Sequence, residues 1–311
     1  PREMVVLGGG PIACELAQAM SELGIRVTLV GRNKRLLPKE DEAVGDAVRK
    51  ALTGSGVRVL TGAQAMTAER EGDHQRLWVQ HGGESEALSF DVLLLAVGRT
   101  ARTTGYGLET LGIGTTQQGT VEVNEYLQTR YPNIYACGDV AGPYQFTHVA
   151  AHQAWYAAVN GLFGALKRFK ADYRVIPAVT FTHPEVARVG LNQDEARRQG
   201  IAFEVSRFEL EEVDRAITAD EREGFVEVLT VPGKDTSLGV TIVASHAGEM
   251  LAEFTLAMRH GLGLKKILGT IHPYPTWSEA AKYVAGVWQK AHAPEAALRW
   301  SARYHRWQRG G

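Results

Sequence analysis

The chain lacks the features that mark several classes of protein. It has only two cysteines among 311 residues, so no disulfide framework is present, which fits a reducing compartment. Its longest purely apolar run covers residues 92–97, far short of the ~20 residues that a membrane span needs. No signal peptide is visible, and the formal net charge of −1 attracts neither nucleic acid nor a membrane. We therefore expect a cytoplasmic protein with no transmembrane span and no nucleic-acid partner.

Metal-ligand clusters are also lacking. His148, His152 and His183 are not spaced with a further group of ligands, so we expect structural roles for them and no metal site. The 44% of hydrophobic and 22% of charged residues are ordinary for a globular chain, and the length allows two or three domains.

A glycine-rich turn near the start carries the first functional signal. Residues 4–7 predict a buried strand, and the apolar spacing after Pro11 predicts a helix. Between them, Gly8 permits the turn, Gly10 lets the backbone approach a pyrophosphate, and Ala13 allows helix and strand to pack closely. The start of the helix offers free N–H groups to phosphate. The alternative is a turn without a ligand, and the strand–turn–helix context favours nucleotide binding.

The end of the second predicted strand (residues 27–30) favours NADPH over NADH. An acidic residue usually binds the ribose hydroxyls there, but this chain has Gly31 followed by Arg32. A carboxylate would repel a 2′-phosphate, whereas a guanidinium can bind it through two hydrogen bonds. The alternative is a solvated basic loop.

Further patterns complete this part of the chain. We expect a helix over 43–52, a strand over 57–60, a polar hairpin around Gly82 and a fully buried strand over 91–97, after which Gly98 closes the domain.

A second glycine-containing segment points to a flavin. Residues 134–137 predict a strand that ends in Gly138 and Asp139, and the following Ala-rich residues to about Gly164 predict a helix. An Asp at such a helix start can accept hydrogen bonds from ribityl hydroxyls while the helix dipole faces phosphate. It can equally cap the helix. The segment alone leaves both interpretations open.

From about residue 176 the pattern changes to strands bounded by polar turns, with helices beside them. The expected strands are 179–182, 202–208, 225–230 and 238–245, and the expected helices are 248–260 and 277–289.

The order of these motifs resembles the class I pyridine nucleotide–disulfide oxidoreductases, which include glutathione reductase, dihydrolipoamide dehydrogenase and mercuric reductase. The resemblance covers nearly the whole chain. The matching segments are 8–13 with Glu15, 96–99, 136–142, 181–190, and 275–276 with Glu279.

The resemblance implies an α/β fold in three parts. These are a Rossmann-type NAD(P)-binding domain over 1–98, the C-terminal part of an FAD-binding domain over 99–172, and an α+β dimerisation domain over 173–311 that forms a homodimer. Gly98, Gly138 and Asp139 are then cofactor-binding residues.

The amino-terminal flavin half of the family, with its redox-active cysteine pair, has no counterpart here. We therefore expect a fragment, inactive alone, whose FAD binding needs the missing half. Glu15 matches a glutamate that faces a lysine of that half near the flavin ring, and its alternative role is a solvated helix carboxylate. Cys14 and Cys137 are expected to be small buried thiols without redox function.

The last motif departs from the thiol reductases of the family. Those enzymes usually present His-x-His-Pro-Thr, in which the second His is the acid/base and a later Glu orients it. Here His272 takes the first position, Tyr274 the catalytic one and Glu279 the orienting one. A phenol with a pKa of about 10 is a poor acid/base near pH 7. Mercuric reductase has a similar Tyr, but its C-terminal cysteine pair is absent here. The alternative for Tyr274 is an interface aromatic between two prolines.

Two functions remain open at this point. The first is an NADPH-dependent, FAD-containing oxidoreductase similar to mercuric reductase or dihydrolipoamide dehydrogenase, represented by its nucleotide-binding and dimerisation portion. The second is a non-catalytic module that binds nucleotide and dimerises.

The final residues show two adjacent helical stripes, one of arginines and one of aromatics. Residues 291–311 contain four Arg and one Glu. Residues 297–309 could lie on an anionic membrane surface. The alternative is a helix that packs its aromatics on the body and solvates its arginines.

Overall fold

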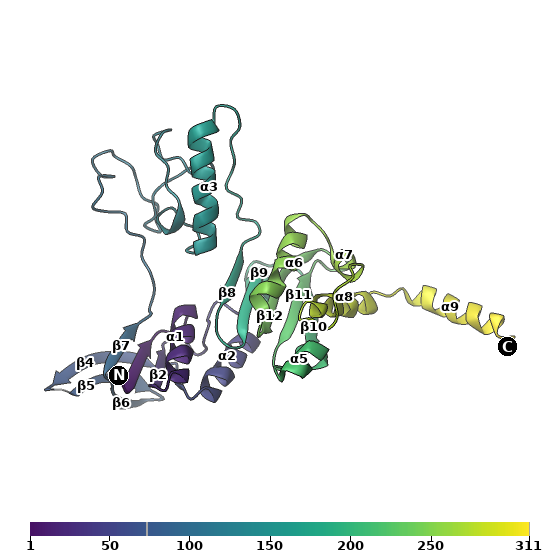
Figure 1. The fold of residues 1–311 in the computed structure, drawn as a ribbon, viewed down its shortest axis with the longest axis horizontal. Coiled ribbons are helices and arrows are strands. Elements are labelled where there is room, and N and C mark those ends of the chain that lie inside the picture. Colours follow the sequence, from purple (N-terminus) through teal and green to yellow (C-terminus); the bar gives the residue numbers. More distant parts are fainter. Residues whose placement is uncertain (73, 311) are drawn as a thin grey trace. The chain divides into compact units, whose positions relative to one another are not determined.

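The computed structural model describes residues 1–72 and 74–310; the side chains of residues 71 and 295–298 lie outside this description. The chain forms two compact units (Figure 1). The first combines Pro1–Val97 with Pro177–Gly311, and the second is Gly98–Ile176.

The first unit opens with a Rossmann-type βαβ arrangement. A parallel sheet has the strand order β3-β2-β1-β7, and the predicted strands and helices of this part are confirmed. An antiparallel sheet, β4-β5-β6, forms the hairpin region. The elements are β1 (Glu3–Leu7), α1 (Pro11–Glu22), β2 (Arg26–Gly31), α2 (Glu42–Gly54), β3 (Arg58–Thr61), β4 (Gln64–Glu71), β5 (His74–His81), β6 (Glu84–Ser89) and β7 (Val92–Leu95).

Strand β7 corrects one expectation. We predicted a fully buried strand over 91–97, but Val92 is 39% exposed and Leu95 is 65% exposed. The reason is topological, because β7 pairs with β1 and forms the edge of the parallel sheet. A continuous apolar run predicts a strand without revealing whether it is central.

The C-terminal part of the first unit is an antiparallel sheet of order β10-β11-β12-β9-β8 with helices packed beside it. Its predicted strands and two long helices are confirmed, whereas β9 and the short helices had not been predicted. The elements are β8 (Pro177–Thr180), β9 (Glu185–Gly190), α4 (Gln193–Arg198), β10 (Glu204–Glu209), η2 (Leu210–Glu212), α5 (Asp214–Ala219), β11 (Phe225–Thr230), β12 (Ser237–Ala244), α6 (Ala247–Arg259), α7 (Leu264–Leu268), α8 (Glu279–Ala291) and α9 (Glu295–Gln308).

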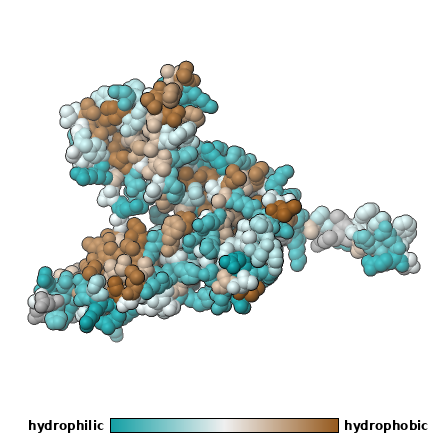
Figure 2. All heavy atoms as spheres, in the orientation of Figure 1, coloured by the Kyte–Doolittle hydropathy of each residue, from teal (hydrophilic) through white to brown (hydrophobic). Residues whose placement is uncertain are grey.

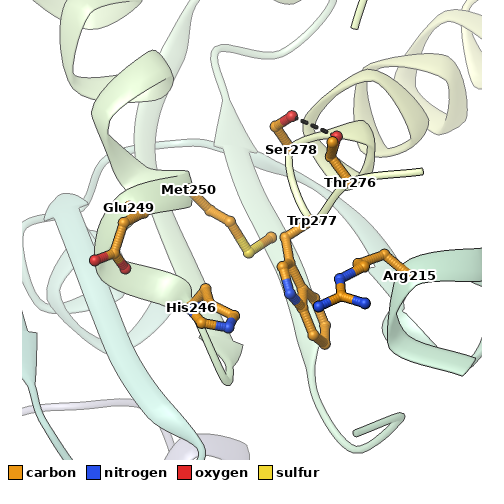
Figure 3. A pocket seen from close by; sticks show the side chains of 7 residues that line it. All are labelled: Arg215, His246, Glu249, Met250, Thr276, Trp277 and Ser278. Carbon is orange, nitrogen blue, oxygen red and sulfur yellow. Dashed lines mark hydrogen bonds between the residues drawn. The ribbon is translucent and has the colours of Figure 1, made fainter. Parts of the chain in front are cut away.

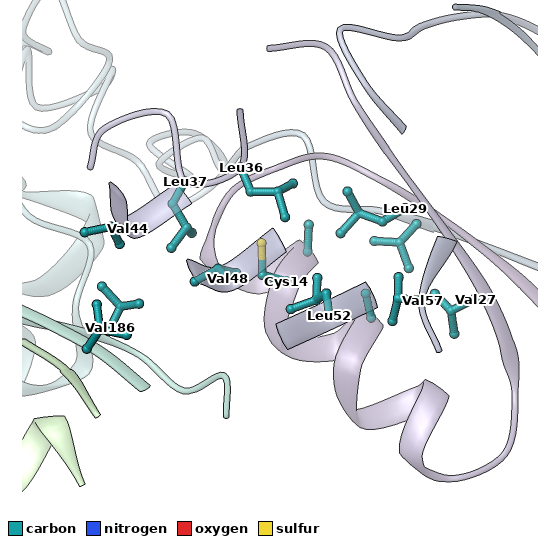
Figure 4. Packing of buried hydrophobic residues seen from close by; sticks show 14 of the residues in the cluster. Cys14, Val27, Leu29, Leu36, Leu37, Val44, Val48, Leu52, Val57 and Val186 are labelled. Carbon is teal, nitrogen blue, oxygen red and sulfur yellow. The ribbon is translucent and has the colours of Figure 1, made fainter. Parts of the chain in front are cut away.

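One hydrophobic core joins the two parts of this unit. Val186, Phe225 and Val243 of the antiparallel sheet belong to the same buried cluster as Val44 of α2 and Leu29 of β2. Figure 4 shows Val186 beside the side chains of the α2 region. The nucleotide part and the dimerisation part are therefore one packed body.

A buried ion network crosses the same boundary. Arg188 of β9 donates to Glu40 and to Glu195, each at 2.7 Å, and its side chain is only 16% exposed. Burial raises the pKa of Glu40, although Arg188 opposes that shift. Removal of one partner from such a network leaves an unpaired buried charge.

The second unit contains a short 3-10 helix, η1 (Gly138–Val140), and one long helix, α3 (Thr147–Phe163). The predicted strand over 134–137 is wrong, because only an isolated bridge between Gln128 and Tyr135 forms there. The predicted helix is confirmed, but it begins at Thr147 and not directly after Asp139. A cis peptide bond between Gly142 and Pro143 lies in the intervening segment.

The second unit exposes much apolar surface. Figure 2 shows hydrophobic side chains gathered on the face of this unit that is in view. Around the end of α3, Leu162 is 76% exposed, Leu166 is 89% exposed and Phe163 is more than half exposed. Trp155, in the middle of this helix, is also more than half exposed. An apolar patch of this kind is typical of an interaction surface.

In the described residues, no helix combines the length and hydrophobicity needed to cross a bilayer.

Candidate functional site

The turn between β1 and α1 has the geometry of a dinucleotide site. Gly8 has φ +142°, and a Cβ added there would lie 2.4 Å from the carbonyl oxygen of Ala96. Only glycine fits this position, because both the backbone conformation and the space exclude a side chain. The same added Cβ would lie 3.3 Å from the Ala13 side chain, which is fully buried. A residue larger than Ala at position 13 would therefore separate helix and strand.

The start of α1 is open to a ligand. Gly10 is its N-cap, Pro11 is its first residue, and no side chain caps it. Its first turn carries no acidic residue, and a Cβ at Gly10 would meet no atom within 4 Å. The unpaired N–H groups and the helix dipole can therefore stabilise an anionic group beside Gly10.

The end of β2 presents basic side chains. Gly31 is buried, while Arg32 and Lys34 are exposed, and no ion pair holds either of them within the described chain. Arg35 differs, because its guanidinium donates to Asp194 at 2.6 Å. Arg32 and Lys34 are thus available to a ligand, whereas Arg35 is already paired.

Glu15 and Gln18 hold the loop between β8 and β9. One carboxylate oxygen of Glu15 accepts from the backbone N–H of Phe181 at 2.9 Å. The Gln18 side chain, which is only 4% exposed, donates to the carbonyl of His183 and accepts from its N–H, at 2.9 and 2.7 Å. Glu15 is therefore partly engaged in structure, and it is not a free, solvated carboxylate. Its second oxygen makes no hydrogen bond within the described chain.

Gly98 begins the second unit, where Gly138 and Asp139 also lie. Gly98 has φ +146° and open space around it. Gly138 has φ +79°, and its N–H donates to the buried Gln153 side chain at 2.6 Å. The Asp139 carboxylate caps no helix; it lies 3.8 Å from Arg99 and is 48% exposed. The structure thus removes the capping role for Asp139 and leaves its oxygens accessible.

Tyr274 lies at the surface with one strong partner. The residue is 70% exposed, and its hydroxyl donates to Asp214 of α5 at 2.8 Å. The hydrogen bond to the Asp214 carboxylate raises the pKa of Tyr274, because it favours the neutral phenol. Tyr274 is therefore a fixed, exposed phenol that keeps its proton near neutral pH.

Glu279 has a different role in the same turn. It is 7% exposed at the start of α8, and it accepts from the backbone N–H of Thr276 and from the Tyr283 hydroxyl, both at 3.1 Å. Within the described chain no hydrogen bond joins it to Tyr274. His272 pairs with Glu253 at 3.0 Å and is nearly buried. The structure thus brings Tyr274 and Glu279 into one turn but gives Tyr274 another carboxylate as partner.

A cavity of about 340 Å³ lies beside this turn (Figure 3). Trp277 forms one wall, and the indole N–H of this residue is buried without a hydrogen-bond partner in the described chain. Neither Tyr274 nor Glu279 lines the cavity. The lining residues are Arg215, His246, Glu249, Met250, Thr276, Trp277 and Ser278.

The two cysteines occupy different environments. Cys14 is completely buried, and burial together with the nearby Glu15 charge raises its pKa to about 12. The thiol is therefore un-ionised and unreactive at neutral pH. Cys137 is only partly buried. Across the described residues, no group of three or more His, Cys, Asp or Glu side chains is arranged to hold a metal ion.

Sequence reasoning missed two residues that organise these sites. Gln18 falls on the buried face of α1 one turn after Glu15, and a polar residue in an otherwise apolar stripe was the available signal. Asp214 carries no comparable signal, because it contacts Tyr274 across 60 residues of sequence.

Comparison with known proteins agrees with this geometry. Residues 1–154 match the family model described as pyridine nucleotide-disulphide oxidoreductase, and residues 176–285 match the model of that family's dimerisation domain.

Individual relatives agree as well. Dihydrolipoyl dehydrogenase of Thermus scotoductus is 39% identical over 281 residues, which are 90% of this chain and 60% of that protein. Mercuric reductase of Staphylococcus aureus is 35% identical over 290 residues, which are 93% of this chain and 53% of that protein. A solved structure of the HOCl-induced flavoprotein disulfide reductase RclA from Escherichia coli is similar with a TM-score of 0.83 at 26% identity, covering 92% of this chain and 65% of that one.

The chain spans between 53% and 65% of the length of these three relatives. On these grounds the chain belongs to the class I pyridine nucleotide–disulfide oxidoreductase family.

Proposed function

We propose that the chain is the nucleotide-binding and dimerising portion of an NADPH-dependent, FAD-containing oxidoreductase similar to mercuric reductase and dihydrolipoamide dehydrogenase. The observation that carries the proposal is the Gly8 turn against Ala96 at the uncapped start of α1. Members of the family use FAD and NAD(P)H, and these cofactors supply hydride and electron transfer when bound.

The turn after β1 fits the pyrophosphate of a dinucleotide. The free N–H groups at the start of α1 would hold the phosphates, and the space at Gly10 allows the close backbone approach that this needs. Arg32 would bind the 2′-phosphate of NADPH, since its guanidinium is exposed and unpaired within the described chain.

The second unit fits a part of a flavin domain. Asp139 is half exposed and caps no helix, so its carboxylate is available to the hydroxyls of a flavin side chain. Gly138 and Gly98, both at positive φ, keep the adjoining backbone free of side chains. The exposed apolar side chains around α3 support the proposal that further residues complete this domain and that FAD binding needs them.

The C-terminal turn would serve the electron acceptor. We place Tyr274 at the acceptor side, opposite the dithiol of the partner subunit in a homodimer formed through residues 173–311. Its 70% exposure supports this role, and Glu279 supports it by fixing the backbone of Thr276. The free oxygen of Glu15 supports a role for that carboxylate near the flavin. Tyr274→Phe in the complete enzyme should then impair reduction of the native acceptor while leaving reduction of the flavin by NADPH intact.

A titration of the chain with NADPH and NADH tests the cofactor preference. The double substitution Gly31→Glu and Arg32→Ala should shift binding toward NADH, because it removes a phosphate contact contributing roughly 1.5–3 kcal/mol, about 10- to 150-fold in affinity. A Cβ at position 31 would meet its nearest atom at 3.7 Å, an ordinary van der Waals contact. Arg49→Ala, which removes an exposed arginine of α2, is the matched control and should change neither affinity. Equal affinity of the unmodified chain for both cofactors would contradict the proposal.

The second candidate is a non-catalytic nucleotide-binding dimer. It is favoured by the two cysteines, which are not spaced in the sequence like the redox-active pair of the family. Mass spectrometry of the purified chain together with its absorbance in the flavin band separates the candidates, since a yellow 311-residue chain would show that this portion holds FAD alone. For both candidates we propose a cytoplasmic location, where free thiols stay reduced.

A further inference from the structure

Helix α9 presents an aromatic stripe that the rest of the chain leaves uncovered. Trp300 is 69% exposed, Tyr304 42% and Trp307 76%. Spacings of four and three residues place the three rings on one side of the helix, where Trp300 and Tyr304 stack with centroids 5.7 Å apart. The helix lies beyond residues 176–285, which match the dimerisation domain. The aromatic stripe, defined as these three residues, is thus not core, and it lies outside the residues that match the dimerisation model.

A row of cations flanks the aromatic stripe. Arg303 and Arg306 follow the stripe along one side of the helix, and Arg309 is the residue at its C-cap. All three are exposed, and no carboxylate pairs with them among the side chains that the structure describes. Residues 291–311 contain four Arg and one Glu, so this end of a nearly neutral chain carries a concentrated positive charge.

An aromatic stripe flanked by arginines fits the surface of a lipid membrane better than a protein or nucleic-acid partner. Trp and Tyr have an apolar body and a polar tip, and they favour the boundary between lipid headgroups and acyl chains. Arginines beside such a stripe extend to the phosphates at headgroup level. A helix whose aromatic side chains bind another protein surface would pack them into an apolar groove and would not need unpaired cations beside them. A helix that binds nucleic acid would direct its cations, and not its aromatic side chains, toward the ligand.

We propose that α9 binds the surface of an anionic phospholipid membrane, with the aromatic stripe at the interface and Arg303, Arg306 and Arg309 on the lipid phosphates. The helix lies parallel to the surface, because its 14 residues are too few and too polar to span a bilayer. This inference does not depend on the oxidoreductase activity proposed above.

Sedimentation of the full chain with vesicles tests this proposal. Vesicles of phosphatidylcholine with phosphatidylglycerol should bind the chain and shift its tryptophan emission to shorter wavelength, whereas phosphatidylcholine alone should bind it far more weakly. Replacing Arg303, Arg306 and Arg309 with Gln should reduce binding at least tenfold, and added salt should do the same. Trp300→Ala with Trp307→Ala should reduce binding and remove the spectral shift.

The matched control removes the same charge elsewhere. Lys234→Gln, Lys266→Gln and Lys282→Gln change exposed lysines outside α9 and should leave vesicle binding unchanged. Circular dichroism and NADPH binding show whether each variant is folded. No binding of the unmodified chain to anionic vesicles would overturn the proposal, as would equal losses in the Arg and Lys variants. A change in oligomeric state on Trp300→Ala without any vesicle binding would also overturn it, and would identify a second copy as the occupant.

Discussion

The turn over residues 8–13 and the turn over residues 272–279 are both recognisable in sequence, yet they are built differently. The first is set by the backbone, since Gly8 must approach the Ala96 carbonyl and the only requirement on the nearby Ala13 side chain is small size. The second is set by side chains, since Tyr274 takes its partner from α5, 60 residues away. The geometry of a turn that depends on the backbone can be predicted from its residue types. The geometry of a turn that depends on side-chain contacts can be predicted only when the three-dimensional fold is known.

The largest effect should come from Gly8→Ala. The added Cβ would meet the Ala96 carbonyl at 2.4 Å in a backbone conformation that L residues avoid. We expect a loss of about 2–4 kcal/mol in the free energy of unfolding, measured by urea denaturation, and loss of nucleotide binding. Gly10→Ala is the control, because its φ is −88° and its surroundings are open. It should keep stability and lose only nucleotide affinity, and equal destabilisation by both changes would contradict the backbone account.

A smaller effect is expected from Glu279→Ala in the second turn. The substitution leaves the Thr276 N–H and the Tyr283 hydroxyl without their partner in a nearly buried place, which should cost about 1–3 kcal/mol. Glu249→Ala is the matched control, since Glu249 is an exposed carboxylate in the first turn of α6. Thermal denaturation should show a clearly lower melting temperature for Glu279→Ala and an unchanged one for Glu249→Ala. Equal melting temperatures for the two variants would mean that Glu279 does not fix this turn.

The smallest expected effect is on the pKa of the Tyr274 phenol. Asp214→Asn removes the carboxylate that raises the pKa of Tyr274, so the phenol should ionise at lower pH than in the unmodified chain. A raised phenol pKa means that the proton is retained below it, so the two proteins should differ only in alkaline solution. The titration is followed by the absorbance of tyrosinate at 295 nm. The contribution of the other tyrosines is subtracted by titrating Tyr274→Phe alone and Tyr274→Phe combined with Asp214→Asn. An unchanged midpoint would remove Asp214 as the partner of Tyr274.

The regular elements of the fold followed largely from the sequence. Apolar periodicity and glycine positions locate β1, α1, β2 and α2, because local contacts determine them. Periodicity could not reveal that β7 is an edge strand. The exposure of a strand depends on its neighbours in the sheet, and a continuous apolar run has the same sequence pattern in an edge strand as in a central one. Periodicity also suggested a strand over 134–137, where the structure forms only an isolated bridge between Gln128 and Tyr135 and no continuous ladder.

The candidate sites were predictable to unequal degrees. Gly8, Gly10 and Ala13 could be given roles from residue type, because the physical requirement is small size. The capping interpretation of Asp139 and the solvated interpretation of Glu15 could be judged only once Thr147 and Phe181 were in place. Gln18 and Asp214 act through contacts that no spacing in the sequence encodes.

The core shared by Val186, Phe225 and Leu29 makes Pro1–Val97 and Pro177–Gly311 a single thermodynamic body. In the sequence, the second compact unit lies between Val97 and Pro177. The residues on either side of it nevertheless pack into one hydrophobic core. Cutting the protein after Val97 would leave the β2 and α2 side of that core facing water, and the nucleotide part should not fold well alone. By linkage, NADPH bound at α1 would also stabilise the dimerisation sheet, although no ligand atom touches it.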